Sequence, residues 1–152
     1  MTIVKYLIDT NALSRIGRKS RESTFVRDNC KIPSEVLHEA ATFPDIAMLR
    51  TLEYPISADV LNLLRDVMST VPPGDKDLID LYHARGNADP ILVATALDAI
   101  AKSEETLLVE DWQIVTDDEG VKKKAAEFNL RTVSSPEFKK LIGATDTCDN
   151  SS

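Results

Sequence analysis

The sequence predicts an α/β fold, a three-layer α/β/α sandwich whose central sheet is mostly parallel. Short apolar segments typical of strands alternate along the chain with amphipathic segments that have helical spacing. The first segment, residues 3–8, is a mostly apolar run with β-branched members, as expected for a strand that is buried on both faces. Together these two observations favour a parallel sheet covered by helices on both sides.

The elements after the first strand are predicted in order from helix and turn signals. Polar, Arg-rich sequence continues to about residue 29 and predicts one or two short helices. Ser34 is a plausible N-cap for a helix that Pro44 ends. Residues 52–56 predict an edge strand or a loop, because Pro55 removes a ladder donor. Further helices are expected at residues 57–68, 75–86, 89–101, 120–128 and 136–142, one strand at 130–133, and either two short strands or one interrupted strand at 107–116.

Length and composition favour a single domain. Residues 1–143 are expected to form it, and the polar residues 144–152 a disordered tail. No stretch is long and apolar enough for a membrane span, and the first residues lack the layout of a signal peptide. Two cysteines, Cys30 and Cys148, give no disulfide framework, so a reducing, cytoplasmic setting is expected.

The net charge of −7 argues against a protein that coats nucleic acid, but it does not exclude an enzyme that acts on nucleic acid. Basic residues are unevenly placed, and a solvated helix face is an equally open explanation for each cluster. The two clusters consist of Arg15, Arg18, Lys19, Arg21 and Arg27, and of Lys122, Lys123 and Lys124.

Four acidic residues fall at or near the ends of predicted elements: Asp9, Glu39, Asp89 and Asp118. Asp9 directly follows the first strand, so its carboxylate is expected at the edge of the sheet where ligands bind in open α/β folds. Carboxylates gathered in one crevice repel each other unless a cation holds them together. Each acid also has a plainer explanation, as an N-cap, an Asx turn or a solvated charge.

The sequence contains no motif of a zinc, nucleotide-binding or serine-hydrolase site. His38 and His83 belong to no zinc-binding pattern, and the sequence has no GxGxxG, Walker or GxSxG motif. The four acidic residues are therefore the main candidates for a functional site.

Taken in order, four segments resemble the PIN-domain nucleases, and among them the stand-alone toxins of the VapC type. The matching segments are residues 7–13 (LIDTNAL), 33–39 (PSEVLHE), 88–96 (ADPILVATA) and 114–118 (IVTDD). Each is weak alone, but their order is reasonably specific and the resemblance spans nearly the whole chain. It implies a PIN-like version of the predicted sandwich.

By this resemblance the four acids take the catalytic, metal-binding positions of the family, with Mg²⁺ or Mn²⁺ as the cofactor. Spacing from Ser34 favours Glu39 over Glu35, and the family pattern of threonine, any residue, aspartate selects Asp118 over Asp117. The polar residues implied as support are Thr10, Asn11 and Thr116.

The resemblance implies an endoribonuclease that hydrolyses RNA phosphodiester bonds and is the toxin of a toxin–antitoxin pair, held by an antitoxin protein and dimerised through its helices. Flanking phosphates would be held by Arg15, Arg18, Lys19 and Arg21. Three alternatives stay open: a non-catalytic PIN-like module that binds RNA or protein, an RNA-processing nuclease that is not a toxin, and a phosphotransfer domain with Asp9 as the acceptor.

Overall fold

The computed structural model describes residues 2–69, 88–107 and 109–150, without the side chains of residues 2, 88, 89 and 145–150. The helix expected at residues 75–86 lies outside the described residues. Five parallel strands form one sheet in the order β3-β2-β1-β4-β5, which confirms the predicted α/β sandwich with a parallel sheet. The strands are β1 (Thr2–Ile8), β2 (Cys30–Pro33), β3 (Glu53–Tyr54), β4 (Val109–Val115) and β5 (Arg131–Val133).

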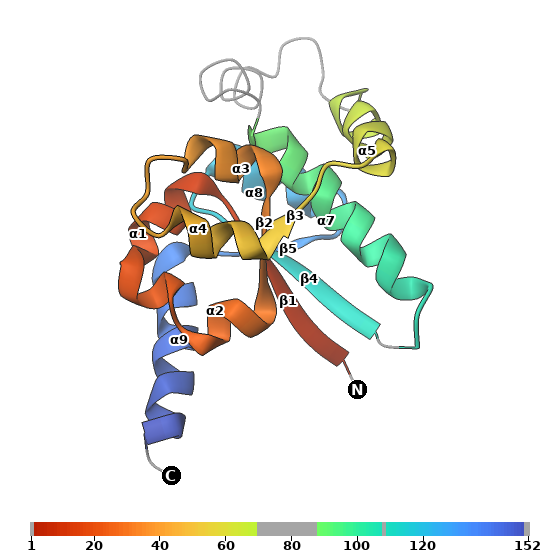
Figure 1. Cartoon of the computed structure of the whole chain (residues 1–152). Helices are drawn as coiled ribbons and strands as arrows, with labels where there is room; N and C mark the ends of the chain where they lie inside the picture. The colour runs from red at the N-terminus through yellow and green to blue at the C-terminus, as the bar shows by residue number, and fades with distance from the viewer. Residues whose placement is uncertain (1, 70–87, 108, 151–152) are drawn as a thin grey trace.

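Helices cover both faces of the sheet (Figure 1). On one face α1 (Thr10–Arg21), α2 (Thr24–Asn29) and α9 (Ser135–Asn150) pack together. On the other, α7 (Ala88–Glu104) packs against β4, α5 (Ala58–Ser69) and α8 (Glu119–Glu127). The short α3 (Ser34–Glu39) contacts both α1 and α7, and α4 (Ile46–Leu49) with the 3₁₀ helix η1 (Arg50–Leu52) leads into β3. In the described part of the chain, no helix has the length and apolarity to cross a bilayer.

The central strands are buried on both faces. Leu7, Ile8, Ile114 and Val115 are fully buried, which explains the apolar runs in the sequence. On the α9 face, the Tyr6 ring packs at a tilt against Phe138, with 5.0 Å between ring centroids. The pairing of β1 with β4 runs from Thr2↔Val109 to Ile8↔Val115, whereas β2 begins only opposite Tyr6.

Two sequence predictions need correction. Residues 109–115 form one uninterrupted strand, because the burial of Trp112 and Ile114 keeps the whole segment in the sheet. Helix α9 continues to Asn150, beyond the end predicted at residue 142. No proline follows Ile142 to stop the helix, and Gly143 alone does not end it.

A buried ion pair fixes the end of α1. Arg21 donates to both carboxylate oxygens of Asp45 at 2.8 and 2.9 Å and to the Leu13 carbonyl at 3.1 Å. The Arg21 guanidinium also lies 4.7 Å from the centre of the Phe43 ring. Within α1, Gly17 has φ 84° and ψ 161°, a conformation that only glycine adopts readily, and it allows the last turn to change direction.

We predict that Asp45→Asn destabilises the protein by about 3–5 kcal/mol, because it leaves the buried Arg21 charge without its counter-ion. The hydrogen bond from Arg21 lowers the pKa of Asp45 below its ordinary value of 3.8. A lowered folded-state pKa adds stability that is present above the unfolded pKa and is lost as the pH falls through the folded value. Urea denaturation should therefore show an acid-side loss of stability in the wild type that is smaller in Asp45→Asn.

The matched control is Glu22→Gln, which breaks the exposed Arg18–Glu22 pair. That change should cost less than about 1 kcal/mol, because solvent already screens the pair. Equal losses in the two variants would contradict the structural role of Asp45.

Candidate functional site

The candidate site lies where the chain order of the sheet reverses. After β1 the chain builds β2 on one side of it, and β4 later adds to the other side. Ligands of open α/β sheets bind outside the carboxyl ends of the strands at such a switch point. Asp9 follows β1 and Thr116 follows β4, so both residues lie at this point.

Asp9 has a buried carboxylate, with 2% of the residue exposed. Its backbone N–H donates to the Val115 carbonyl at 3.1 Å, which fastens it to the end of β4. Asp9 occupies the N-cap position of α1, yet its side chain makes no capping hydrogen bond. Capping therefore does not account for this aspartate, and burial of its charge requires other partners.

Thr116 joins the two strand ends. Its hydroxyl donates to Asp9 Oδ2 at 2.8 Å and accepts from the Asp118 amide at 3.1 Å. Thr116 is fully buried, so water does not compete for these bonds. The side chain predicted as polar support thus orients the Asp9 carboxylate directly.

Asp118 is the N-cap of α8. Its Oδ1 accepts from the backbone N–H groups of Gly120 at 2.8 Å and Val121 at 3.2 Å. Helix capping therefore accounts for the Oδ1 atom of Asp118. A cap and a metal ligand are compatible, because a carboxylate has two oxygens with several acceptor sites.

Asp117 has a structural role. Its carboxylate accepts from the Ser135 amide at 2.8 Å and the Ser135 hydroxyl at 2.6 Å, and it pairs with Arg15 at 2.7 Å. Burial alone would raise the pKa of Asp117, but the hydrogen bonds from Ser135 and the charge of Arg15 outweigh it and lower the pKa. This network ties α9 and α1 to the end of β4, and the sequence prediction did not include it. Its signal in the sequence is the Ser-Ser-Pro-Glu run at the start of α9.

A small hollow of about 50 Å³ opens beside these residues, lined by Asn11, Arg15, Asp117 and Asp118. The hydroxyl of Thr10, which precedes Asn11 in the chain, is buried and has no hydrogen-bond partner among the described residues. A buried hydroxyl without a partner costs about 1–3 kcal/mol, and such groups mark sites that a ligand or water completes.

Glu39 lies at the surface, and Asp89 is located by its backbone alone. Glu39 is the last residue of α3 and is exposed. Asp89 lies in the first turn of α7, and its side chain is not among those described. Of the described His, Cys, Asp and Glu side chains, no three are grouped closely enough to hold a metal ion. Hydrogen bonds through Thr116 thus join Asp9 and Asp118.

The four predicted phosphate contacts have different surroundings. Arg15 lies at the hollow, Lys19 is exposed, and Arg18 is paired with Glu22. Arg21 is 6% exposed and bound to Asp45, so its guanidinium is not available to RNA, and its expected role in phosphate binding is wrong.

The sequence matches no model of a known protein family and no curated protein. Any function of this edge therefore rests on the geometry described above.

We predict that Thr116→Val destabilises the protein by about 1–3 kcal/mol, because the isosteric side chain removes a hydrogen bond from the buried Asp9 carboxylate. Chemical denaturation at neutral pH measures the loss. Thr116→Ser keeps the hydroxyl and should retain most of the stability. A valine variant as stable as the wild type would show that Asp9 does not depend on this bond.

Proposed function

We propose that this protein is a metal-dependent endoribonuclease, with its site at the carboxyl ends of β1 and β4. The observation that carries the proposal is the Asp9 carboxylate, which is buried at the switch point, leaves its own helix uncapped and is held by Thr116. Burial of a charged group costs free energy unless the group is paired, hydrogen-bonded or bound to a metal ion. The resemblance of residues 7–13, 33–39, 88–96 and 114–118 to PIN-domain nucleases supplies the class of reaction.

The donor chemistry of the site fits Mg²⁺ or Mn²⁺, which prefer carboxylate oxygens and keep several waters. Asp9 and Asp118 would hold the ion, with Asp89 and Glu39 completing the set by the family resemblance. When bound, such an ion lowers the pKa of a coordinated water and offsets the charge of the phosphate. The unpartnered Thr10 hydroxyl beside Asp9 is in keeping with a site that a bound group completes.

The residues of the chain itself would orient the reactants. Thr116 fixes the direction of the Asp9 carboxylate, and the capping bonds fix Asp118 against α8. Arg15, which pairs with Asp117 and lines the hollow, would contact a phosphate that lies against its opening. Water would add to phosphorus as the bond to the 3′-oxygen breaks and the proton passes to that oxygen, leaving 5′-phosphate and 3′-hydroxyl ends.

We further propose, by the same resemblance, that the enzyme is the toxin of a toxin–antitoxin pair and forms a homodimer. An acidic chain with a net charge of −7 suits an antitoxin segment with basic side chains. The assignment to a toxin is separate from the chemistry, since an RNA-processing enzyme would use the same site.

We predict that Asp9→Asn and Asp118→Asn each lower the rate of Mn²⁺-dependent RNA cleavage by more than about a hundredfold, since even changes around a metal ligand cost about 10–100-fold. Asparagine keeps the shape at position 9 and keeps a good N-cap at position 118. A gel assay on a structured RNA, with and without EDTA, measures the rates.

Asp118→Ala separates the two roles of that residue. It should lose the activity and also about 0.5–2 kcal/mol of stability, because the cap of α8 is gone. Asp66→Asn, an exposed acid on α5, is the matched control and should keep full activity. Full metal-dependent cleavage by Asp9→Asn would refute the assignment and favour a non-catalytic module.

A further inference from the structure

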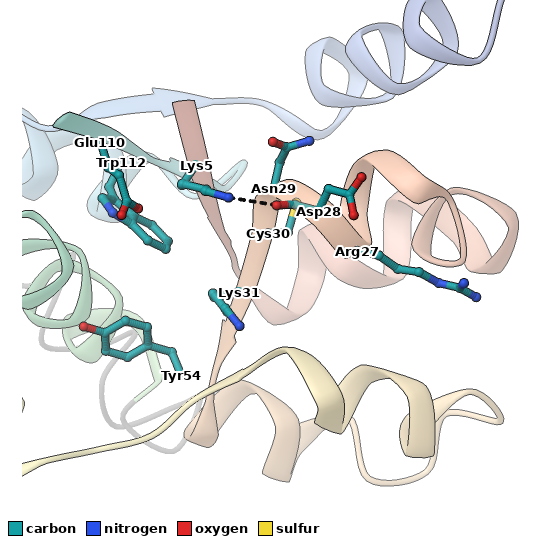
Figure 2. A pocket seen from close by; sticks show the side chains of 9 residues that line it. All are labelled: Lys5, Arg27, Asp28, Asn29, Cys30, Lys31, Tyr54, Glu110 and Trp112. Atoms are coloured by element: carbon teal, nitrogen blue, oxygen red, sulfur yellow. Dashed lines mark hydrogen bonds between the residues drawn. The ribbon is translucent and has the colours of Figure 1, made fainter. Parts of the chain in front are cut away.

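A cavity of about 390 Å³ lies away from the candidate nuclease site. Lys5, Lys31, Tyr54, Glu110 and Trp112 contribute to its walls (Figure 2). They come from four neighbouring strands near the amino ends of β2 and β4, whereas Asp9 and Thr116 follow the carboxyl ends of β1 and β4. Its volume falls within the range of small-molecule sites, about 300–1,000 Å³.

The strand register creates this cavity. β1 and β4 pair along their full length, but β2 begins only opposite Tyr6, so the amino halves of β1 and β4 extend beyond it. Side chains alternate between the two faces of a strand. Tyr6 packs toward α9, and therefore Lys5 projects from the face that α7 covers in part, next to its register partner Trp112.

Two lysines on this sheet face are unusual. Strands of a parallel sheet are normally apolar because helices cover both faces, yet Lys5 interrupts β1 and Lys31 interrupts β2. Lys31 pairs in register with Leu7, which lies on the same face of β1 as Lys5. The two ammonium groups therefore stand on one face, two residues apart in register, where like charges repel unless an anion lies between them.

No carboxylate of the described residues forms an ion pair with either lysine. Lys5 Nζ donates to the backbone oxygen of Asp28 at 2.8 Å, as the dashed line in Figure 2 shows, and an ammonium group has two further donors. The charged residues that line the cavity are Lys5, Lys31 and Arg27 against Asp28 and Glu110, so its net charge is +1. The Arg27 side chain extends away from the lysines in Figure 2, so Lys5 and Lys31 are the cations proposed to contact an anion directly.

The opposite wall is aromatic and rigid. Tyr54 and Trp112 meet edge to face with 6.2 Å between ring centroids. The Tyr54 hydroxyl donates to Asp98 at 2.6 Å, and Lys102 donates to the same carboxylate at 2.9 Å, so the phenol is anchored to α7. Figure 2 shows Tyr54 and Trp112 on one side of the cavity and Lys5 and Lys31 on the side toward Cys30.

We propose that this cavity binds a mononucleotide, with its phosphate between Lys5 and Lys31 and its base against the Tyr54–Trp112 wall. Ammonium groups bind phosphate as point charges, and aromatic side chains accept any base because every base has a π-face. The site is independent of the proposed nuclease chemistry, since it uses none of the acids at the other edge of the sheet.

Trp112 is the only tryptophan of the chain, so its fluorescence reports on this wall directly. The full chain is titrated with the four ribonucleoside 5′-monophosphates, with adenosine and with inorganic phosphate, and calorimetry repeats each titration. We expect a saturable change with at least one monophosphate and affinities about tenfold weaker or more for adenosine and phosphate, because each lacks half of the contacts.

Lys31→Gln should weaken monophosphate binding about tenfold, the value of one charge-assisted hydrogen bond. Lys31 is exposed, so this change leaves folding intact, and Lys5→Gln provides a second test. Lys140→Gln, an exposed cation on α9, is the matched control and should bind normally. Asp9→Asn should also bind normally, which separates this site from the nuclease proposal.

The inference is overturned if no monophosphate gives a saturable signal. It is also overturned if inorganic phosphate or adenosine binds as tightly as the monophosphates, or if Lys31→Gln binds like the wild type.

Discussion

The pairing of β1 with β4 is the constraint on which the candidate site depends. Seven register pairs, from Thr2↔Val109 to Ile8↔Val115, align the two strands so that they end together. Asp9 and Thr116 are then the first residues beyond the sheet, and the hydrogen bond between them closes the end of the pair at 2.8 Å. A shift by one residue would turn each side chain of a strand to the other face of the sheet and would separate Asp9 from Thr116.

The same pairing separates the acidic site and the lysine-lined cavity, which lie toward opposite ends of the strands. At the carboxyl edge, Asp117 and Asp118 line a hollow that is too small for more than an ion or water. Near the amino ends of β2 and β4 lies a larger cavity, because β2 begins only opposite Tyr6. Lys5 and Lys31 contribute to its walls. Parallel strands make such a division natural, because all amino ends meet at one edge and all carboxyl ends at the other.

The sequence predicted the fold well because its signals are local and strong. Apolar runs placed β1 and the start of α7, and Ser34 and Ser57 marked helix starts. Asp9 and Asp118 were predicted correctly as residues at strand ends, but only the structure shows that Asp118 caps α8 and Asp9 caps nothing. Arg21 was misjudged because its partner, Asp45, is distant in sequence, and no local pattern reveals that the pair is buried. The Asp117–Ser135–Arg15 network escaped prediction for the same reason.

The central claim is that the buried Asp9 carboxylate is a metal ligand. Calorimetric titration of Mn²⁺ into the wild type and Asp9→Asn tests it most directly, because it requires no knowledge of the RNA. The account predicts saturable binding by the wild type in the millimolar range or tighter, and its loss in Asp9→Asn. Absence of binding by the wild type, or equal binding by both proteins, would contradict it.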